Sequence, residues 1–154
     1  MFKLGLTGSI ATGKSTALAA FAALGYPVFS ADEAVHLLYR GEAVTPVEKA
    51  FPQAVAGGKI DRTILLKLLV DSPQRIEELN KIVHPLVRAK IADFMQKSAA
   101  AAAKLAVIDI PLLFETGVNY GFDAVAVTFC DDQIQRRRAL ARPDMDVEKL
   151  NTIL

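Results

Sequence analysis

The sequence has little of what several common kinds of site require. It contains one cysteine, Cys130, and only two histidines. One cysteine cannot form an internal disulfide, and so few Cys and His residues give no zinc-type cluster. No apolar run approaches the roughly 20 residues that a membrane-spanning helix needs. We therefore expect no disulfide, zinc site or membrane partner, and we interpret Cys130 as a small apolar residue of the interior.

The charge is nearly balanced, with a formal net charge of +1. This gives no broad attraction to nucleic acid, so phosphate binding must be local and geometric. The chain of 154 residues suits one compact domain. The apolar start, residues 1–6, is too short for the core of a signal peptide and leads into a glycine-rich loop, which favours a cytoplasmic location.

Apolar segments of strand length alternate with helical patterns, which predicts an α/β fold with a parallel, doubly wound sheet. Irregular structure with at most one short helix is expected between residues 40 and 58, which contain two prolines and a Gly-Gly pair. The expected strands are 2–7, 26–30, 105–110 and 124–129, and the expected helices are 15–24, 32–39, 61–70, one from Ser72, one from Pro85 toward 103, one from 132 toward 142, and 146–154.

The strongest motif runs from Gly8 to Ser15 with the sequence GSIATGKS, which fits G-x-x-x-x-G-K-[ST] at every fixed position. It follows a predicted strand and opens a predicted helix, as a phosphate-binding loop must. We expect Lys14 to reach the β- and γ-phosphates of ATP and Ser15 to bind Mg²⁺. The predicted nucleotide contacts are Gly8, Ala11, Thr12, Gly13, Lys14, Ser15 and Thr16.

Two aspartates near predicted strand ends are candidates for acid-base or metal chemistry. Asp32 follows the second strand, where it could accept a proton, hold the metal, or simply cap a helix. Asp109 ends an apolar strand in the manner of a metal-binding aspartate, although it could equally satisfy backbone groups before Pro111. Position alone does not separate these readings.

Several other charged residues and one histidine allow both a functional and an ordinary structural interpretation. Arg138 and Arg142 share one helix face that could close over phosphates, or they could belong to an ordinary solvated surface. His84, just before Pro85, is either structural or a substrate contact. Arg62 and Glu115, considered locally, are typical surface charges.

Several separate blocks resemble dephospho-CoA kinases in content and order, and together they span residues 4–154. The phosphate loop is common to many nucleotide-binding proteins, whereas the His84-Pro85 step and the block 110–115 (IPLLFE) are far more particular. The remaining matches are residues 30–32, residues 60–62 with Leu65, residues 79–83, and Gln135 with Arg138 and Arg142.

This resemblance implies a three-layer P-loop kinase fold with a parallel sheet, a helical substrate-binding excursion and a lid helix. It further implies ATP-dependent phosphorylation of the ribose 3′-hydroxyl of dephospho-CoA. Asp32, Lys14, Arg138 and Arg142 would then be catalytic, and Arg62, His84 and Glu115 would join Asp32 in binding the acceptor. The implied layout is a single domain, residues 1–154, with a nucleotide-binding core at 1–40 and 104–131, an acceptor-binding region at 41–103, and a partial lid at 132–154.

The sequence departs from the family in two respects. Members usually continue for several tens of residues beyond the equivalent of Leu154, and they usually carry an aspartate where this chain has Ser30. A truncated ATP-binding module without turnover is therefore one alternative, and another small-molecule P-loop kinase is a second. We expect a monomer or a weak homo-oligomer.

Overall fold

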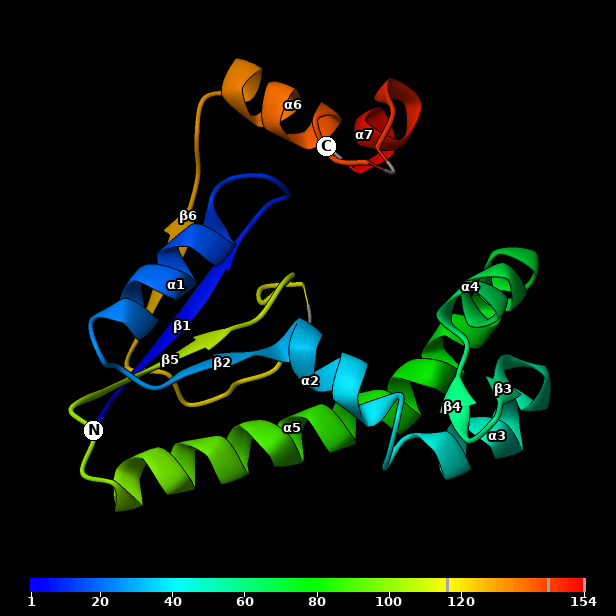
Figure 1. Ribbon diagram of the computed structural model, residues 1–154, viewed down its shortest axis with the longest axis horizontal. Coiled ribbons are helices and arrows are strands. Elements are labelled where there is room, and N and C mark those ends of the chain that lie inside the picture. The colour runs from blue at the N-terminus through cyan, green and yellow to red at the C-terminus, as the bar shows by residue number, and fades with distance from the viewer. Residues whose placement is uncertain (116, 144, 154) are drawn as a thin grey trace. The chain divides into compact units, whose positions relative to one another are not determined.

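The computed structural model describes residues 1–115, 117–143 and 145–153 (Figure 1). The chain divides into two compact units, and each is described by itself below. The first consists of Met1–Ser30 together with Lys97–Leu154, and the second is Ala31–Gln96.

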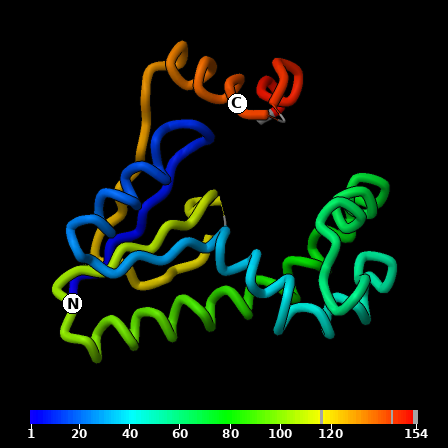
Figure 2. The backbone as a smooth tube through the Cα atoms, in the orientation of Figure 1, coloured from blue at the N-terminus to red at the C-terminus, as the bar shows by residue number. Residues whose placement is uncertain are grey.

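The first unit is built on a four-stranded sheet with the strand order β2-β5-β1-β6. All neighbouring strands are parallel, which confirms the predicted α/β class and parallel sheet. Helix α1 packs against β1, β5 and β2, and the backbone trace leads from β1 through a wide loop into this helix (Figure 2). The elements are β1 (Phe2–Gly8), α1 (Lys14–Ala23), β2 (Val28–Ser30), β5 (Leu105–Asp109) and β6 (Ala124–Thr128).

The central strands supply the core of this unit. Ala106, Val107 and Ile108 of β5 are completely buried, and Leu6 of β1 is nearly so. A parallel strand covered on both faces is apolar at consecutive positions, so the continuous apolar run predicted this strand correctly. Asp109, the last residue of β5, pairs in register with Leu6 on β1 and with Ser30 on β2. The carboxyl ends of three strands thus meet at this edge.

Two short helices follow β6 in the first unit. Helix α6 (Asp132–Leu140) starts where the Asp131 carboxylate accepts a hydrogen bond from the Gln133 backbone N–H. Helix α7 (Val147–Ile153) packs against α6, and Arg136 donates a hydrogen bond of 2.7 Å to the Asn151 side chain. Both helices were predicted from the sequence, with ends within two residues of those observed.

The second unit is mainly helical. Its core centres on Phe51, which is completely buried and lies under the Arg75 guanidinium, 4.1 Å from the ring centre. The Asp61 carboxylate caps α4 by accepting bonds from the Thr63 and Ile64 N–H groups. The elements are α2 (Ala31–Leu38), α3 (Val44–Ala50), the 3₁₀-helix η1 (Pro52–Ala54), β3 (Val55–Ala56), β4 (Lys59–Ile60), α4 (Arg62–Asp71), the 3₁₀-helix η2 (Pro73–Arg75) and α5, which runs from Ile76 to Ala100 and so ends in the first unit.

The prediction of a helix beginning at Pro85 is wrong. Pro85 lies inside α5, a continuous helix of 25 residues that starts at Ile76. Proline removes one backbone hydrogen bond and its ring crowds the carbonyl four residues earlier, but its own φ already has a helical value. A long helix can keep its remaining hydrogen bonds on both sides of that gap. The segment from Ser72 forms only a 3₁₀ turn, Pro73–Arg75, before α5 begins.

Between residues 40 and 58, where at most one short helix was expected, the chain forms α3 and the single-turn 3₁₀-helix η1. A β-hairpin was missed. Strands β3 and β4 pair antiparallel around Gly57 and Gly58, which both have positive φ. Strands of two residues are too short to show an alternating pattern, so only the Gly-Gly turn could have indicated this hairpin.

Across the described residues, no helix has the length and apolar character needed to cross a membrane.

Replacing Phe51 by alanine should destabilise the second unit. Because the ring is completely buried and carries Arg75 above it, we expect a loss of about 3–5 kcal/mol in the free energy of unfolding. Leu66→Ala on the exposed side of α4 is the control and should change it by less than about 0.5 kcal/mol. Urea unfolding curves of both variants measure this, and equal midpoints would contradict the assigned core.

Candidate functional site

The loop between β1 and α1, which we call the phosphate loop (Gly8–Ser15), depends on unusual backbone angles. Gly8 has φ +153° and Gly13, which precedes α1, has φ +100°. Ala11 adopts φ +60° without being glycine. A Cβ atom on Gly8 would lie 2.2 Å from the Thr128 Oγ1 and 2.7 Å from the Thr128 carbonyl oxygen. Glycine is therefore required at the start of the loop by close contact as well as by conformation.

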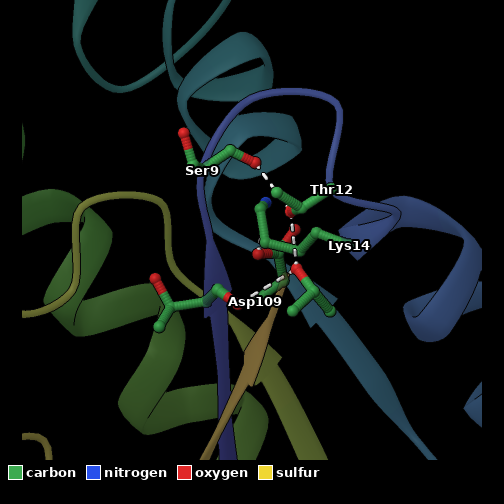
Figure 3. A network of polar contacts seen from close by, with 6 residues as sticks. Ser9, Thr12, Lys14 and Asp109 are labelled. Carbon is green, nitrogen blue, oxygen red and sulfur yellow. Dashed lines mark hydrogen bonds and ion pairs between the residues drawn. The ribbon is translucent and has the colours of Figure 1, made fainter. Parts of the chain in front are cut away.

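Side chains hold the loop from within and from β6 (Figure 3). The Thr12 hydroxyl donates to the Ser9 carbonyl at 2.8 Å. Its oxygen also lies 2.8 Å from the Thr128 hydroxyl, which in turn lies 3.4 Å from the Thr7 carbonyl. Thr12 is buried, so the motif position that sequence reasoning assigned to nucleotide contact has a clear structural role in shaping the loop.

Lys14 and Asp109 form an ion pair at the carboxyl end of the sheet. The Lys14 Nζ donates to the Asp109 Oδ1 at 2.6 Å, and these side chains are 14% and 5% exposed. Figure 3 shows the lysine of the phosphate loop and the aspartate at the end of β5 side by side. Lys14 and Asp109 lie 95 residues apart in the sequence, and their side chains are thus joined by a direct hydrogen bond.

The first turn of α1 provides further groups for an anion. Ser15 and Thr16 are both exposed there. The first N–H groups of a helix have no partner within the helix, and they carry the positive end of its dipole. A phosphate placed at this end would meet backbone N–H groups, the Ser15 and Thr16 hydroxyls and the Lys14 ammonium.

Asp32 lies in the first turn of α2, two residues beyond the end of β2. The helix begins at Ala31, so Asp32 is inside the helix and is not the residue that precedes it. Its side chain is exposed. An acidic residue in a first helical turn interacts favourably with the helix dipole, and an exposed carboxylate is also available to a ligand.

Arg62 is exposed at the start of α4 and lies close enough to Tyr39 to influence its ionisation. Burial raises the pKa of the Tyr39 phenol, and the positive charge of Arg62 lowers it in part. The Tyr39 carbonyl accepts from the Ile60 N–H at 2.9 Å, which fixes the turn before α4. The residue after the C-terminal end of α2, Tyr39, is therefore held close to the N-terminal end of α4.

His84 lines an open pocket of about 420 Å³ along α5. The other lining residues are Glu77, Asn80, Lys81, Pro85 and Arg88. Lys81, His84 and Arg88 lie on the same side of the helix by their spacing of three and four residues. Of these three residues, only His84 was predicted from the sequence as a substrate contact, although their helical spacing could have indicated a shared face.

Three predicted residues lie on exposed parts of the first unit. Glu115 lies in the turn that follows β5. Arg138 is on α6, and Arg142 follows the end of that helix. All three are solvent-exposed. Among residues 1–115, 117–143 and 145–153, no group of three or more His, Cys, Asp or Glu side chains has the arrangement of a metal cluster.

Thr128 is a site residue that the sequence did not point to, and Gln135 was named only within the family resemblance, with no role assigned to it. Gln135 is buried, and its amide donates to the Ile10 carbonyl of the phosphate loop at 2.8 Å. The Cys130 sulfur lies 3.9 Å from the Ala11 carbonyl. Cys130 is partly buried, and it contacts the loop itself. Only the fold brings these residues to the loop, since they lie more than 110 positions away in the chain.

Known proteins match this chain over nearly its full length. The family model described as dephospho-CoA kinase matches residues 2–154. The dephospho-CoA kinase of Rhizobium meliloti is 52% identical over all of this chain and 79% of its own length, and that of Rhodopseudomonas palustris strain CGA009 is 47% identical, with 77% of its length covered.

Two solved structures are also similar. TT1252 from Thermus thermophilus has a TM-score of 0.83 and 32% identity, with 99% of this chain and 78% of that chain covered. The dephospho-CoA kinase from Campylobacter jejuni has a TM-score of 0.70 and 28% identity, covering 97% of this chain and 77% of that one. The fold of the chain is thus the fold of these proteins.

Replacing Gly8 by alanine should disrupt the phosphate loop. The new Cβ would displace Thr128, so we expect the dissociation constant for ATP to rise about tenfold or more, equivalent to about 1.4 kcal/mol. Gly25→Ala is the matched control, because Gly25 also has positive φ (+83°) but no atom within 4 Å of the added Cβ. Calorimetric titration with ATP compares them. Unchanged affinity in Gly8→Ala would show that the loop does not hold the nucleotide.

Proposed function

The chain belongs to the dephospho-CoA kinase family, and on that premise we propose that it transfers the γ-phosphoryl group of ATP to the ribose 3′-hydroxyl of dephospho-CoA. In this reaction the 3′-oxygen forms a bond to the γ-phosphorus, the bond to the oxygen bridging to the β-phosphorus breaks, and ADP leaves. The hydroxyl proton passes to a base. The products are coenzyme A and ADP.

The observation that carries the proposal is the phosphate loop with Lys14 at its end. The loop carbonyls of Ser9 and Ile10 are engaged by side chains, while the N–H groups at the start of α1 lack helical partners. Phosphoryl transfer needs mainly positioning and neutralisation of charge on the phosphates. The loop positions the phosphates and the Lys14 ammonium neutralises their charge. In this proposal the phosphate loop and Lys14 therefore bind the triphosphate of ATP.

The residues present suit a magnesium ion bound together with ATP. Mg²⁺ is usually held by one or two protein oxygens, several waters and the phosphates. The exposed Ser15 hydroxyl and the Asp109 carboxylate provide such a donor pair. The ion supplies charge neutralisation on the phosphate oxygens when it is bound. Ser15 and Asp109 would hold this ion, and Lys14 would contact the phosphates.

Asp32 is the base in this proposal. Its carboxylate is exposed and follows a strand of the nucleotide-binding unit by two residues, so it is available to accept the proton of the acceptor hydroxyl. Arg62 and the pocket beside His84 belong to the helical unit and contact the rest of the acceptor. Glu115 contributes from the turn after β5.

Arg138 and Arg142 act on the transferring phosphoryl group. Both are exposed arginines on or just after α6, and a planar guanidinium group can donate two parallel hydrogen bonds to oxygens of one phosphate. They stabilise negative charge as it develops and exclude water from the phosphoryl group. We also propose that the reaction takes place in the cytoplasm.

The proposal is tested by measuring ADP formation from ATP and Mg²⁺, with and without dephospho-CoA. ADP that forms only when dephospho-CoA is present, together with coenzyme A detected by mass spectrometry, is the expected result. Nucleotide binding without any acceptor-dependent turnover would overturn the assigned reaction while leaving the phosphate loop in place.

Asp32→Asn should abolish transfer and leave ATP binding nearly unchanged. Loss of a general base lowers turnover by about 10² to 10⁴, whereas the phosphate loop does not include Asp32. Glu33→Gln removes the same charge from the neighbouring position of α2 and should retain turnover. Steady-state rates together with calorimetric ATP titrations of both variants provide the comparison. Wild-type turnover in Asp32→Asn would eliminate Asp32 as the base.

Substitutions of lid and acceptor residues should separate kcat from KM. We expect Arg138→Ala to lower kcat by about 10² or more, because it removes a group that acts on the transition state. His84→Ala should instead raise KM for dephospho-CoA by roughly 2- to 10-fold, the effect of one hydrogen bond. The adjacent exposed Arg137→Ala and the exposed Gln96→Ala on α5 are the respective controls. The opposite pattern of effects would reverse the two assignments.

A further inference from the structure

Gln135 is a buried polar side chain that the proposed reaction does not use directly. It is 8% exposed, and it lies in the first half of α6, the helix that carries Arg138. Its amide nitrogen donates to the Ile10 carbonyl at 2.8 Å, across 125 residues of sequence. A buried amide bonded to a phosphate-loop carbonyl is a specific link between this helix and the loop.

The link is reinforced on both sides of the connection between β6 and α6. The Thr128 hydroxyl, at the end of β6, lies 2.8 Å from the Thr12 hydroxyl. The Cys130 sulfur lies 3.9 Å from the Ala11 carbonyl. The start of α6 is itself fixed, because the Asp131 carbonyl accepts from the Gln135 N–H at 2.9 Å. The segment 128–135 is thus attached to the phosphate loop at three positions.

Helical spacing relates this attachment to the two arginines. With about 3.6 residues per turn, Arg138 lies three positions after Gln135 and nearly one turn along the helix, and Arg142 lies close to two turns along. The backbone continues in a helical turn past Leu140, since the Arg142 N–H donates to the Ala139 carbonyl. Arg138 therefore lies beside the helix face that Gln135 fixes against the loop, and Arg142 lies just beyond the end of the same helix.

We infer that Gln135 is a positioning residue, which sets the rotation of α6 and thereby directs Arg138 and Arg142 to the phosphates held by the loop. The same hydrogen bond gives the Ile10 carbonyl of the loop a side-chain partner. This inference rests on the proposed kinase function. It adds that the lid helix and the phosphate loop are coupled through one side-chain amide.

The test uses variants that keep the volume of Gln135 and remove the donor. Gln135→Met is close in size and cannot donate, and Gln135→Glu replaces the amide by a carboxylate that would face the Ile10 carbonyl. We expect both to lower kcat for dephospho-CoA-dependent ADP formation by about 10- to 100-fold, as misplacement of catalytic groups does. Gln133→Met on the exposed side of the same helix is the control and should keep wild-type kcat.

A second measurement separates positioning from a purely structural role. Gln135→Met should remain folded, with a midpoint of thermal unfolding only a few degrees lower, because packing is preserved and one hydrogen bond is lost. The KM for dephospho-CoA should not change. In Gln135→Met, the further substitution Arg138→Ala should cost much less kcat than it does in the wild-type background.

Wild-type kcat in Gln135→Met, or full additivity with Arg138→Ala, would overturn the inference. The proposed function is judged separately, by acceptor-dependent turnover of the wild-type chain. If that turnover is absent, the proposed function fails. If it is present and the variants match it, only the positioning role fails.

Discussion

The arrangement of the site depends on one constraint, which is that the phosphate loop must satisfy its carbonyl groups without using its N–H groups. The Ser9 carbonyl accepts from the Thr12 hydroxyl, and the Ile10 carbonyl accepts from the Gln135 amide. The Gly13 carbonyl accepts from the Ala17 N–H within α1. Buried carbonyls without partners would cost free energy, and a loop free to rotate them would lose its anion-binding conformation. A residue as distant in sequence as Gln135 therefore helps to fix the conformation of this eight-residue loop.

This dependence explains which parts of the molecule could be predicted from sequence. The phosphate loop, the strand before it and the helix after it follow from glycine spacing and apolar periodicity, which are local properties. The parallel sheet followed from the alternation of strands and helices, and the family resemblance agreed with it. The contact of Gln135 with Ile10 could not be predicted in this way, because it depends on how β6 pairs beside β1 in the sheet.

The errors have similarly local causes. Pro85 was interpreted as a helix start because proline is favoured there, but the apolar pattern of Leu79 and Val83 continues to Val87 and Ile91, and all four are buried. Burial along one side of α5 stabilises the helix by more than the one hydrogen bond that proline removes. The β3–β4 hairpin was missed because its strands have only two residues each. At Pro85 burial therefore outweighed a local signal, whereas the hairpin has strands too short to give one.

The Lys14–Asp109 pair shows how the same residues can serve the structure before and after ATP binds. With a 2.6 Å separation and both side chains mostly buried, the pair satisfies two charges that would otherwise be costly inside the protein. ATP brings phosphate charge that competes with Asp109 for Lys14. Under the proposed function, a magnesium ion bound with ATP would supply positive charge beside the Asp109 carboxylate. Binding of nucleotide and metal would then be coupled through Asp109, whose ion pair with Lys14 is a role that its sequence position did not indicate.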